Sequence, residues 1–359
     1  MPIFSLITPH FQRPALLAEM VRSVQLQTLN DWELLIVDDQ SAAADWDVIQ
    51  QHGADPRVRL IRRYTGLKGP NTCRNLGLEL SRGEFVIFLD SDDLLAPWCL
   101  QQRFETTRNA SDCNFWVFQT LIFERIPGDR NQLWNSLEGQ DDTVRFLSSS
   151  PPWCMTSPLW RREAILSIGG LDPVLRYGTD SELHTRALLK GLRYRKYPDL
   201  PADVFVRRDD APRFNRTLTQ DLFDAQLARI TAGRRLLTSQ PAARDLCPLW
   251  EKQYFACLEF FIFNAPEPRN WTKRLLEDWQ QLPGARRGAL MLLAAYALCG
   301  RWCRKRAYLL LRVVRRLVLL GPGRRLLQEE TGFHSANLDD AKFRALVDRI
   351  TAAFADAAG

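Results

Sequence analysis

Three carboxylates follow a short apolar run, and this stretch is the part of the sequence best suited to chemistry. Residues 85–89 are mostly β-branched or aromatic, and Asp90, Asp92 and Asp93 come directly after them. Such a run predicts a buried strand. Isolated charges are too costly to bury unless they are paired or bind a metal. The strand is therefore expected to end at Asp90, at the carboxyl edge of a sheet, where open α/β folds bind ligands.

Two interpretations of these carboxylates remain open from this stretch alone. Closely spaced carboxylates suit a hard divalent cation, which would bring a phosphate-bearing ligand with it. A turn followed by a helix N-cap would also explain them, because Asp and Ser favour both positions.

Earlier strands are expected to place further polar groups at the same edge. Residues 3–8 and 34–37 read as strands, and apolar residues at helical spacing lie between them after Pro14. The strands end in the polar loops 9–14 and 38–41. This pattern predicts a βαβ unit whose functional edge lies at the strand carboxyl ends.

The later chain changes character near residue 215. Before that point we expect a helix over 71–80, a strand end and short helix over 159–168, and a helix capped by Thr179 or Asp180. Beyond it helical stretches dominate. Within the first 215 residues, further strands are expected at residues 58–61, 115–118, 121–123 and 204–206, and those at 115–118 and 121–123 are expected to be antiparallel or mixed.

Composition indicates a globular protein of about two domains. The chain has 359 residues, 46% of them hydrophobic and 25% charged, with a net charge of +6. Its eight cysteines are scattered without a CxxC pair, which favours a reducing compartment over a zinc site or a disulfide framework. We see neither a signal peptide nor an apolar run near the ~20 residues of a membrane span, so a cytoplasmic location is expected.

An ordered series of segments resembles glycosyltransferase family 2, whose members have the GT-A fold of nucleotide-sugar transferases. The resemblance covers about the first 210 residues, and no single segment is specific by itself. It implies a GT-A domain over residues 1–215, an α/β fold with a Rossmann-like mixed sheet flanked by helices, followed by an α-helical C-terminal region over 216–359. The segments that carry it lie at residues 5–14, 27–41, 73–93 and 169–186.

The resemblance implies a nucleotide-sugar site and a divalent metal, Mn²⁺ or Mg²⁺. Asp39 would accept from a ring N–H of the base beside Phe11, while Asp38 orients the loop. Asp92 is the preferred metal ligand, Asp90 a second one, and Asp93 a helix cap or sugar contact. The residues expected to bind the nucleotide-sugar are Pro9, Phe11, Arg13, Asp39, Lys68, Arg74, Asp90 and Ser91.

On the acceptor side, Asp180 is the expected general base, which would remove a hydroxyl proton during an inverting displacement. Glu182 is the alternative base or an acceptor-binding group, and Trp153 is placed with it on the acceptor side. The sequence departs from the common family pattern twice. Thr179 stands where Glu often precedes the Asp, and Asp209 stands where a metal-binding or phosphate-binding His often occurs, so Asp209 becomes a third candidate ligand.

Residues 286–325 carry many arginines interleaved with apolar and aromatic groups, and no acidic residue. Basic amphipathic helices of this kind bind anionic membrane surfaces. A helical subdomain with solvated arginines is the alternative. No recognised nucleic-acid-binding module accompanies the charge, so nucleic acid is not expected as a partner.

The expected function is an inverting, metal-dependent glycosyltransferase (EC 2.4 class). It would move a sugar from a nucleotide diphosphate-sugar, with UDP-sugars favoured, to a glycan or lipid-linked acceptor in surface polysaccharide or lipopolysaccharide biosynthesis. The enzyme would lie in the cytoplasm or at the inner face of the membrane. The alternatives are a non-catalytic nucleotide-binding or sugar-binding scaffold of a membrane-associated assembly, and a nucleotidyltransferase.

Overall fold

The computed structural model describes residues 1–108, 110, 112–139, 141–208, 219–264, 268–285 and 336–356. Its residues group into two compact units. The first consists of residues 1–140, 151–211 and 334–359, and the second of residues 141–150 and 212–333. The division expected at residue 215 stays a prediction, while the C-terminal residues 334–359 group with the first unit.

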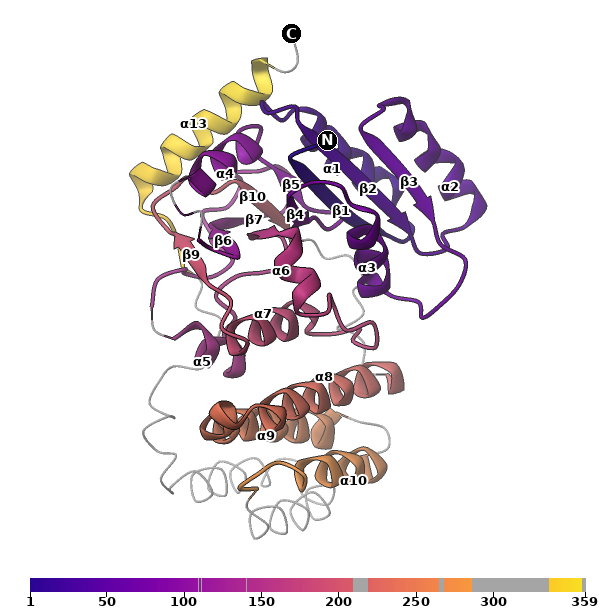
Figure 1. Cartoon of the computed structure of the whole chain (residues 1–359), viewed down its shortest axis with the longest axis vertical. Helices are drawn as coiled ribbons and strands as arrows, with labels where there is room; N and C mark the ends of the chain where they lie inside the picture. The colour runs from indigo at the N-terminus through magenta and orange to yellow at the C-terminus, as the bar shows by residue number, and fades with distance from the viewer. Residues whose placement is uncertain are drawn as a thin grey trace. The chain divides into compact units, whose positions relative to one another are not determined.

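Four parallel strands form one half of the main sheet (Figure 1). They are β1 (Phe4–His10), β2 (Trp32–Asp38), β3 (Val58–Arg62) and β4 (Phe85–Phe88). β1, β2 and β4 are almost entirely buried, as expected for a parallel sheet covered on both faces. Their register pairs the last residue of β2 with the last residues of β1 and β3, so the carboxyl ends of these strands meet at one edge.

The other half of this sheet makes it mixed. β8 (Pro158–Arg161) is antiparallel to β4 and to β6 (Phe115–Phe118), and β6 is parallel to β9 (Tyr194–Tyr197). The strand order is β3-β2-β1-β4-β8-β6-β9. The expected α/β fold with a mixed sheet flanked by helices and a helical C-terminal region is confirmed. Strand β9, however, was not anticipated from the sequence.

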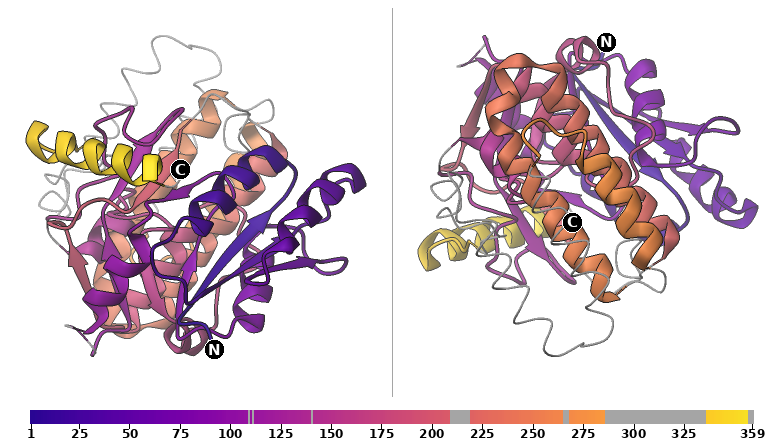
Figure 2. Two further views of the ribbon diagram at one scale, coloured as in Figure 1. Left: turned by 90° about the horizontal axis from the view of Figure 1, so that it is seen from above. Right: turned by 90° about the horizontal axis from the view of Figure 1, so that it is seen from below.

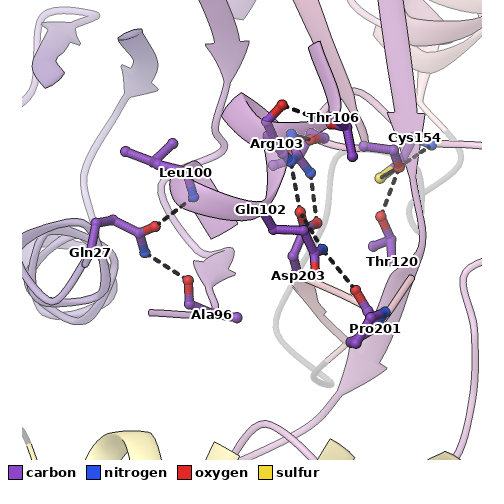
Figure 3. Close-up of polar contacts among 12 residues, drawn as sticks. Gln27, Ala96, Leu100, Gln102, Arg103, Thr106, Thr120, Cys154, Pro201 and Asp203 are labelled. Atoms are coloured by element: carbon purple, nitrogen blue, oxygen red, sulfur yellow. Dashed lines mark hydrogen bonds and ion pairs between the residues drawn. The ribbon is translucent and has the colours of Figure 1, made fainter. Parts of the chain in front are cut away.

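A second, three-stranded sheet begins with a strand that directly follows the three carboxylates. Its order is β5 (Leu94–Leu95), β10 (Val204–Arg207) and β7 (Thr120–Phe123). The buried ion pair between Arg103 and Asp203 ties helix α4 (Cys99–Arg108) to the residue before β10 (Figure 3). This sheet therefore fixes the region immediately after Asp93.

Helices of the first unit pack closely on the main sheet. A Cβ placed on Gly77 of α3 would lie 2.4 Å from Cγ2 of Ile7 on β1, so only glycine permits this approach. The α-helices of the unit, α13 apart, are α1 (Pro14–Gln25), α2 (Ala43–Gln50), α3 (Pro70–Leu80), α4 (Cys99–Arg108), α6 (Arg162–Ser167) and α7 (Thr179–Leu189); the 3₁₀-helix η1 is Gln51–Ala54.

The chain's last described helix, α13 (Asp340–Asp356, yellow in Figure 1), packs on this first unit. Leu346 and Ile350 join its hydrophobic core. The guanidinium carbon of Arg349 lies 4.1 Å from the centre of the Trp98 ring. The segment just before α13 is held by the backbone of Leu338, which exchanges two hydrogen bonds with the Asn131 side chain.

The second unit is helical in its described part. Helices α8, α9 and α10 pack on one another (Figure 2, right). Asp278 accepts hydrogen bonds there from Arg234, Tyr254 and Thr231, which links all three helices. No helix among the described residues is long and apolar enough to cross a bilayer. The helices are α5 (Asp142–Leu147), α8 (Gln220–Ser239), η2 (Pro241–Leu246), α9 (Cys247–Asn264) and α10 (Pro268–Trp279).

Candidate functional site

The loop after β2 is organised by Asp38. Its carboxylate accepts a hydrogen bond from the backbone N–H of Ser41 at 3.0 Å and faces Nδ1 of His10 at 3.3 Å. Burial raises the pKa of Asp38, but the hydrogen bonds with His10 and Ser41 outweigh this and hold the pKa below its usual value. Asp38 is fully buried, so its structural contacts leave it no access to a ligand.

Asp39, the candidate base-binding residue, pairs with Arg63. Nε of Arg63 donates to Oδ1 of Asp39 at 2.6 Å. Beside this pair, Nζ of Lys68 lies 3.8 Å from the centre of the Phe11 ring. Phe11 is 42% exposed, so one aromatic surface remains open to solvent at the end of β1. The structure thus places Phe11, Asp39 and Lys68 on adjoining loops at the carboxyl edge of the sheet.

The loop between Phe11 and α1 has unusual backbone geometry. Gln12 and Arg13 have φ angles of 58° and 62°, in the left-handed region that side chains disfavour. The backbone N–H of Gln12 donates to the Ser41 hydroxyl at 2.8 Å, which joins this loop to that of β2. Strained backbone of this kind clusters at ligand sites. Pro9 is half-buried at the end of β1.

Two arginines face the carboxylates after β4. Arg74 on α3 is buried and pairs closely with Oδ1 of Asp90, whose side chain is 37% exposed. Arg13 approaches Asp92 with an N···O distance of 3.8 Å, and both side chains are partly exposed. Ser91 is half-buried between the two carboxylates. Positive charge is thus already present where a metal and a diphosphate would bind.

Asp93 is a buried link between distant segments, and the expected helix cap is wrong for it. Its carboxylate accepts from the Thr156 hydroxyl at 3.1 Å and from the backbone N–H of Arg207 at 3.3 Å. Nε of Arg207 in turn donates to the backbone carbonyl of Asp92 at 3.2 Å. Burial, followed by the charges of Asp92 and Asp90, raises the pKa of Asp93 well above its usual range. These contacts fix the backbone that presents Asp92.

Asp180 lies in the first turn of α7 and is half-buried. It does not cap this helix, because Gly178 occupies the cap position with φ 64° and no side chain bonds there. Its Oδ1 accepts from the Ser181 backbone N–H at 2.8 Å. Burial raises the pKa of Asp180; the positive charge of Arg74 lowers it and the negative charge of Asp90 raises it. The charges of Arg74 and Asp90 therefore act on the Asp180 carboxyl group.

The other two acceptor-side candidates are held by structural contacts. Glu182 presents both carboxylate oxygens to Arg186, at 2.7 and 2.9 Å. Arg186 also donates to the carbonyls of Ile168 and Gly170, which joins α7 to the preceding loop. Trp153 is 1% exposed and packs against the ring of Phe115.

Two of the sequence-based candidates lie outside the described residues, namely Asp209 and the basic segment 286–325. Among the residues that are described, no group of three or more His, Cys, Asp or Glu side chains could hold a metal by itself. Mg²⁺ commonly binds through one or two carboxylates and completes its shell with substrate phosphates and water. The Asp90 and Asp92 oxygens fit that arrangement.

Sequence reasoning missed three residues that organise the site, namely Arg63, Thr156 and Arg207. Arg63 follows β3 directly, so its place at a strand carboxyl end was a usable signal. Thr156 and Arg207 are 63 and 114 residues from Asp93, their shared partner. The residues around each of them in the sequence give no indication of contacts over such long separations.

A mixed sheet of this order, with carboxylates at the carboxyl edge of its parallel strands, is the arrangement expected of a GT-A fold. Residues 5–155 match the family model described as Glycosyl transferase family 2. The matched segment is less than half of the chain, and it confirms the resemblance to glycosyltransferase family 2 seen in the sequence.

Curated relatives match about a third of the chain. A GalNAc(5)-diNAcBac-PP-undecaprenol beta-1,3-glucosyltransferase of Campylobacter jejuni is 38% identical over 126 residues, covering 35% of this chain and 40% of the relative. The succinoglycan biosynthesis protein ExoW of Rhizobium meliloti is 34% identical over 119 residues, covering 32% and 36%. The chain thus spans well under two thirds of the length of these relatives.

The fold extends further than the sequence similarity. Residues 1–349 of S. aureus TarS, crystallised in complex with UDP-GlcNAc, superpose with a TM-score of 0.62. That comparison covers 94% of this chain and 98% of the TarS chain at 16% sequence identity. It confirms the GT-A fold.

Proposed function

We propose that this chain is an inverting, metal-dependent glycosyltransferase that uses a nucleotide diphosphate-sugar, with UDP-sugars favoured, and a hydroxyl acceptor. The observation that carries the proposal is the convergence of Asp90, Arg74 and Asp180. These residues come from the β4 loop, α3 and α7, and their charges act on one another. Groups proposed for the donor side and for the acceptor side would therefore meet at one place, as a displacement between two substrates requires.

The donor nucleotide would lie across the carboxyl ends of β1, β2 and β4. Phe11 offers an exposed aromatic surface to the base, and Asp39 offers a carboxylate acceptor. Arg13 and Arg74 already face carboxylates at this edge. Both can donate charge-assisted hydrogen bonds to phosphate oxygens. Lys68, beside Phe11, supplies a further cation.

Asp92 and Asp90 would hold Mn²⁺ or Mg²⁺ together with the diphosphate. When bound, the ion would supply Lewis-acid stabilisation of the charge that grows on the leaving diphosphate. The chain's own part is to present the carboxylates in a fixed position. Asp93 does this through its bonds to Thr156 and the Arg207 backbone.

Asp180 would take the proton from the attacking hydroxyl. A base works best when its pKa is near the working pH, and burial moves the pKa of Asp180 in that direction. A single displacement with one base inverts the anomeric centre, whereas retention by double displacement needs a second carboxylate as nucleophile. No such nucleophile was identified among the candidate residues.

For the acceptor, we propose a glycan or a lipid-linked glycan of surface polysaccharide assembly. The names of the relatives support this class, since one acts on a polyprenyl-diphosphate-linked glycan and another serves succinoglycan biosynthesis. We also propose a cytoplasmic enzyme that contacts the anionic inner face of the membrane through residues 286–325. That contact rests on the basic amphipathic sequence.

The test is nucleoside diphosphate release from UDP-glucose, UDP-N-acetylglucosamine and GDP-mannose, with Mn²⁺ and detergent-solubilised lipid-linked glycans. Asp92→Ala and Asp180→Asn should each lower turnover about a hundredfold or more. Asp112→Asn, which alters a side chain 62% exposed, is the matched control and should retain turnover. If turnover survives both site substitutions, the assignment of the site is wrong. Tight nucleotide binding without turnover of any donor would favour the scaffold.

A further inference from the structure

All three nitrogens of the Arg63 guanidinium donate hydrogen bonds at the proposed donor edge, and the roles proposed above do not use this group. Its side chain is 3% exposed. Nε donates to Oδ1 of Asp39 at 2.6 Å, and the two terminal nitrogens donate to the carbonyls of Thr65 and Leu67, each at 2.5 Å. One planar group thus joins the candidate base acceptor to the loop that follows β3.

That loop is shaped around the guanidinium. Gly66 has a φ of +84°, which L side chains rarely adopt, and this lets the carbonyls on either side of it turn toward Arg63. The next residue after Leu67 is Lys68, whose ammonium lies over the Phe11 ring. Arg63 therefore determines which oxygen of Asp39 is left to accept from the base. It also holds the loop that leads to Lys68, beside the Phe11 ring.

The pair is one-sided, which has a chemical consequence. Oδ1 of Asp39 is bonded to Arg63, whereas no described residue donates a hydrogen bond to Oδ2. A base with one ring N–H, flanked by carbonyl oxygens, needs only that second oxygen. A guanine edge presents an N–H and an adjacent amino group, and to bond both it must share Oδ1 and place amino hydrogens beside the Arg63 cation.

We propose that Arg63 is a specificity-determining residue of the donor site, which selects uracil over guanine by occupying one oxygen of Asp39 and fixing residues 65–67. The proposal rests on the nucleotide site proposed above. It adds that selectivity depends on a side chain that needs no contact with the phosphates, the metal or the sugar. Lysine at this position would keep the charge but lose the planar fork, which is the part that makes the three bonds.

The experiment is isothermal titration calorimetry of UDP, GDP and CDP with Mn²⁺, using the full chain. The wild-type protein should bind UDP at least about tenfold more tightly than GDP, the scale of one charge-assisted hydrogen bond. CDP, whose base has no ring N–H, should bind more weakly than UDP. In Arg63→Lys the UDP-to-GDP affinity ratio should fall to within about threefold, because release of Oδ1 of Asp39 raises GDP affinity and loosening of residues 65–67 lowers UDP affinity.

Arg59→Lys is the matched control. Arg59 lies on β3 and pairs with Glu33 at 2.9 Å, away from the carboxyl end of the strand, so its replacement should leave the ratio unchanged. A purely structural role for Arg63 would weaken UDP and GDP equally, and that result would overturn the proposal. So would an unchanged ratio in Arg63→Lys. If that variant does not fold, the wild-type order of UDP, GDP and CDP still decides, because GDP binding as tightly as UDP contradicts selection.

Failure of the wider function can be told apart from failure of this inference. Selective UDP binding that is lost in Arg63→Lys, with no sugar transfer by the wild-type protein, would refute the glycosyltransferase and leave Arg63 as the selector. Sugar transfer with a nucleotide ratio that ignores Arg63 would leave the enzyme and refute the selector. A wild-type protein that binds no nucleotide would refute both.

Discussion

Two arginine–aspartate pairs in the first unit show how the same chemistry can engage both oxygens of a carboxylate in one place and only one oxygen, at the proposed donor site, in another. In the interior, Arg103 holds both oxygens of Asp203, at 2.9 and 2.8 Å, and Gln102 adds a third contact (Figure 3). Both charged side chains are 0% exposed. At the donor edge, Arg63 holds a single oxygen of Asp39. The first pair is closed, and the second leaves an acceptor.

The pair at the end of β4 is more open than the pair of Arg63 and Asp39, whose side chains are 3% and 8% exposed. Arg74 is 5% exposed and its partner Asp90 is 37% exposed, so the cation is buried and the carboxylate faces outward. Buried pairs are costly to form and even more costly to break, because removing one partner leaves an uncompensated charge. Closed pairs should therefore affect stability when broken, and open pairs should affect ligand binding.

The largest expected effect is on stability, from Arg103→Met. This substitution leaves Asp203 buried without its partner and should cost about 3–5 kcal/mol of unfolding free energy. The melting temperature should fall by roughly 10 °C. Arg193→Met is the control, since Arg193 and Asp112 are 67% and 62% exposed and such pairs contribute little. Differential scanning calorimetry measures both; equal shifts in the two variants would remove the distinction between closed and exposed pairs.

Arg74→Met should affect turnover more than stability. Loss of a charge-assisted hydrogen bond of about 1.5–3 kcal/mol corresponds to roughly a 10- to 100-fold decrease in kcat/KM. Arg82→Met, on the exposed loop after the same helix, should leave turnover unchanged. If Arg74→Met lowered the melting temperature as much as Arg103→Met while sparing turnover, Arg74 would belong with the closed pair.

Arg74 should also shift the pH dependence of turnover. Burial raises the pKa of Asp180, and a general base acts only when deprotonated, so kcat/KM should fall as the pH drops through that raised pKa. The acid limb should therefore lie above the range of an exposed aspartate. The positive charge of Arg74 lowers the pKa of Asp180, so the limb should move to still higher pH in Arg74→Met. If the acid limb does not move in Arg74→Met, the charge of Arg74 does not act on the general base.

The sequence predicted the parts of this molecule that depend on local pattern. The apolar runs of β1, β2 and β4 identified the buried strands. The polar residues after them predicted which edge of the sheet carries the candidate site. Strand β9 was missed because its four residues, Tyr194–Tyr197, include two basic side chains and are at most partly buried at the sheet edge. The cap of α7 was misplaced because the left-handed backbone of Gly178 took that position.

Long-range partners could not be read from the sequence. Asp93 looks like a turn or cap residue in its own neighbourhood, and its actual role depends on Thr156 and Arg207. Arg63 looks like one of several arginines around β3 until its bond to Asp39 is seen. Which carboxylates are open and which are closed is a property of tertiary contacts, and it decides what each can do.

The smallest effect is expected at Glu182. The distinction between closed and open pairs gives this residue a structural role, whereas its position in the sequence predicted a role on the acceptor side. Glu182 lies near Asp180 and was expected on the acceptor side, yet both its oxygens are held by Arg186 in a closed pair. Glu182→Gln should therefore keep turnover within about threefold and lower stability by roughly 1 kcal/mol, as partly buried pairs do. A hundredfold loss of turnover at unchanged melting temperature would instead indicate that Glu182 contacts the acceptor. Loss of a purely structural contact would lower the melting temperature as well.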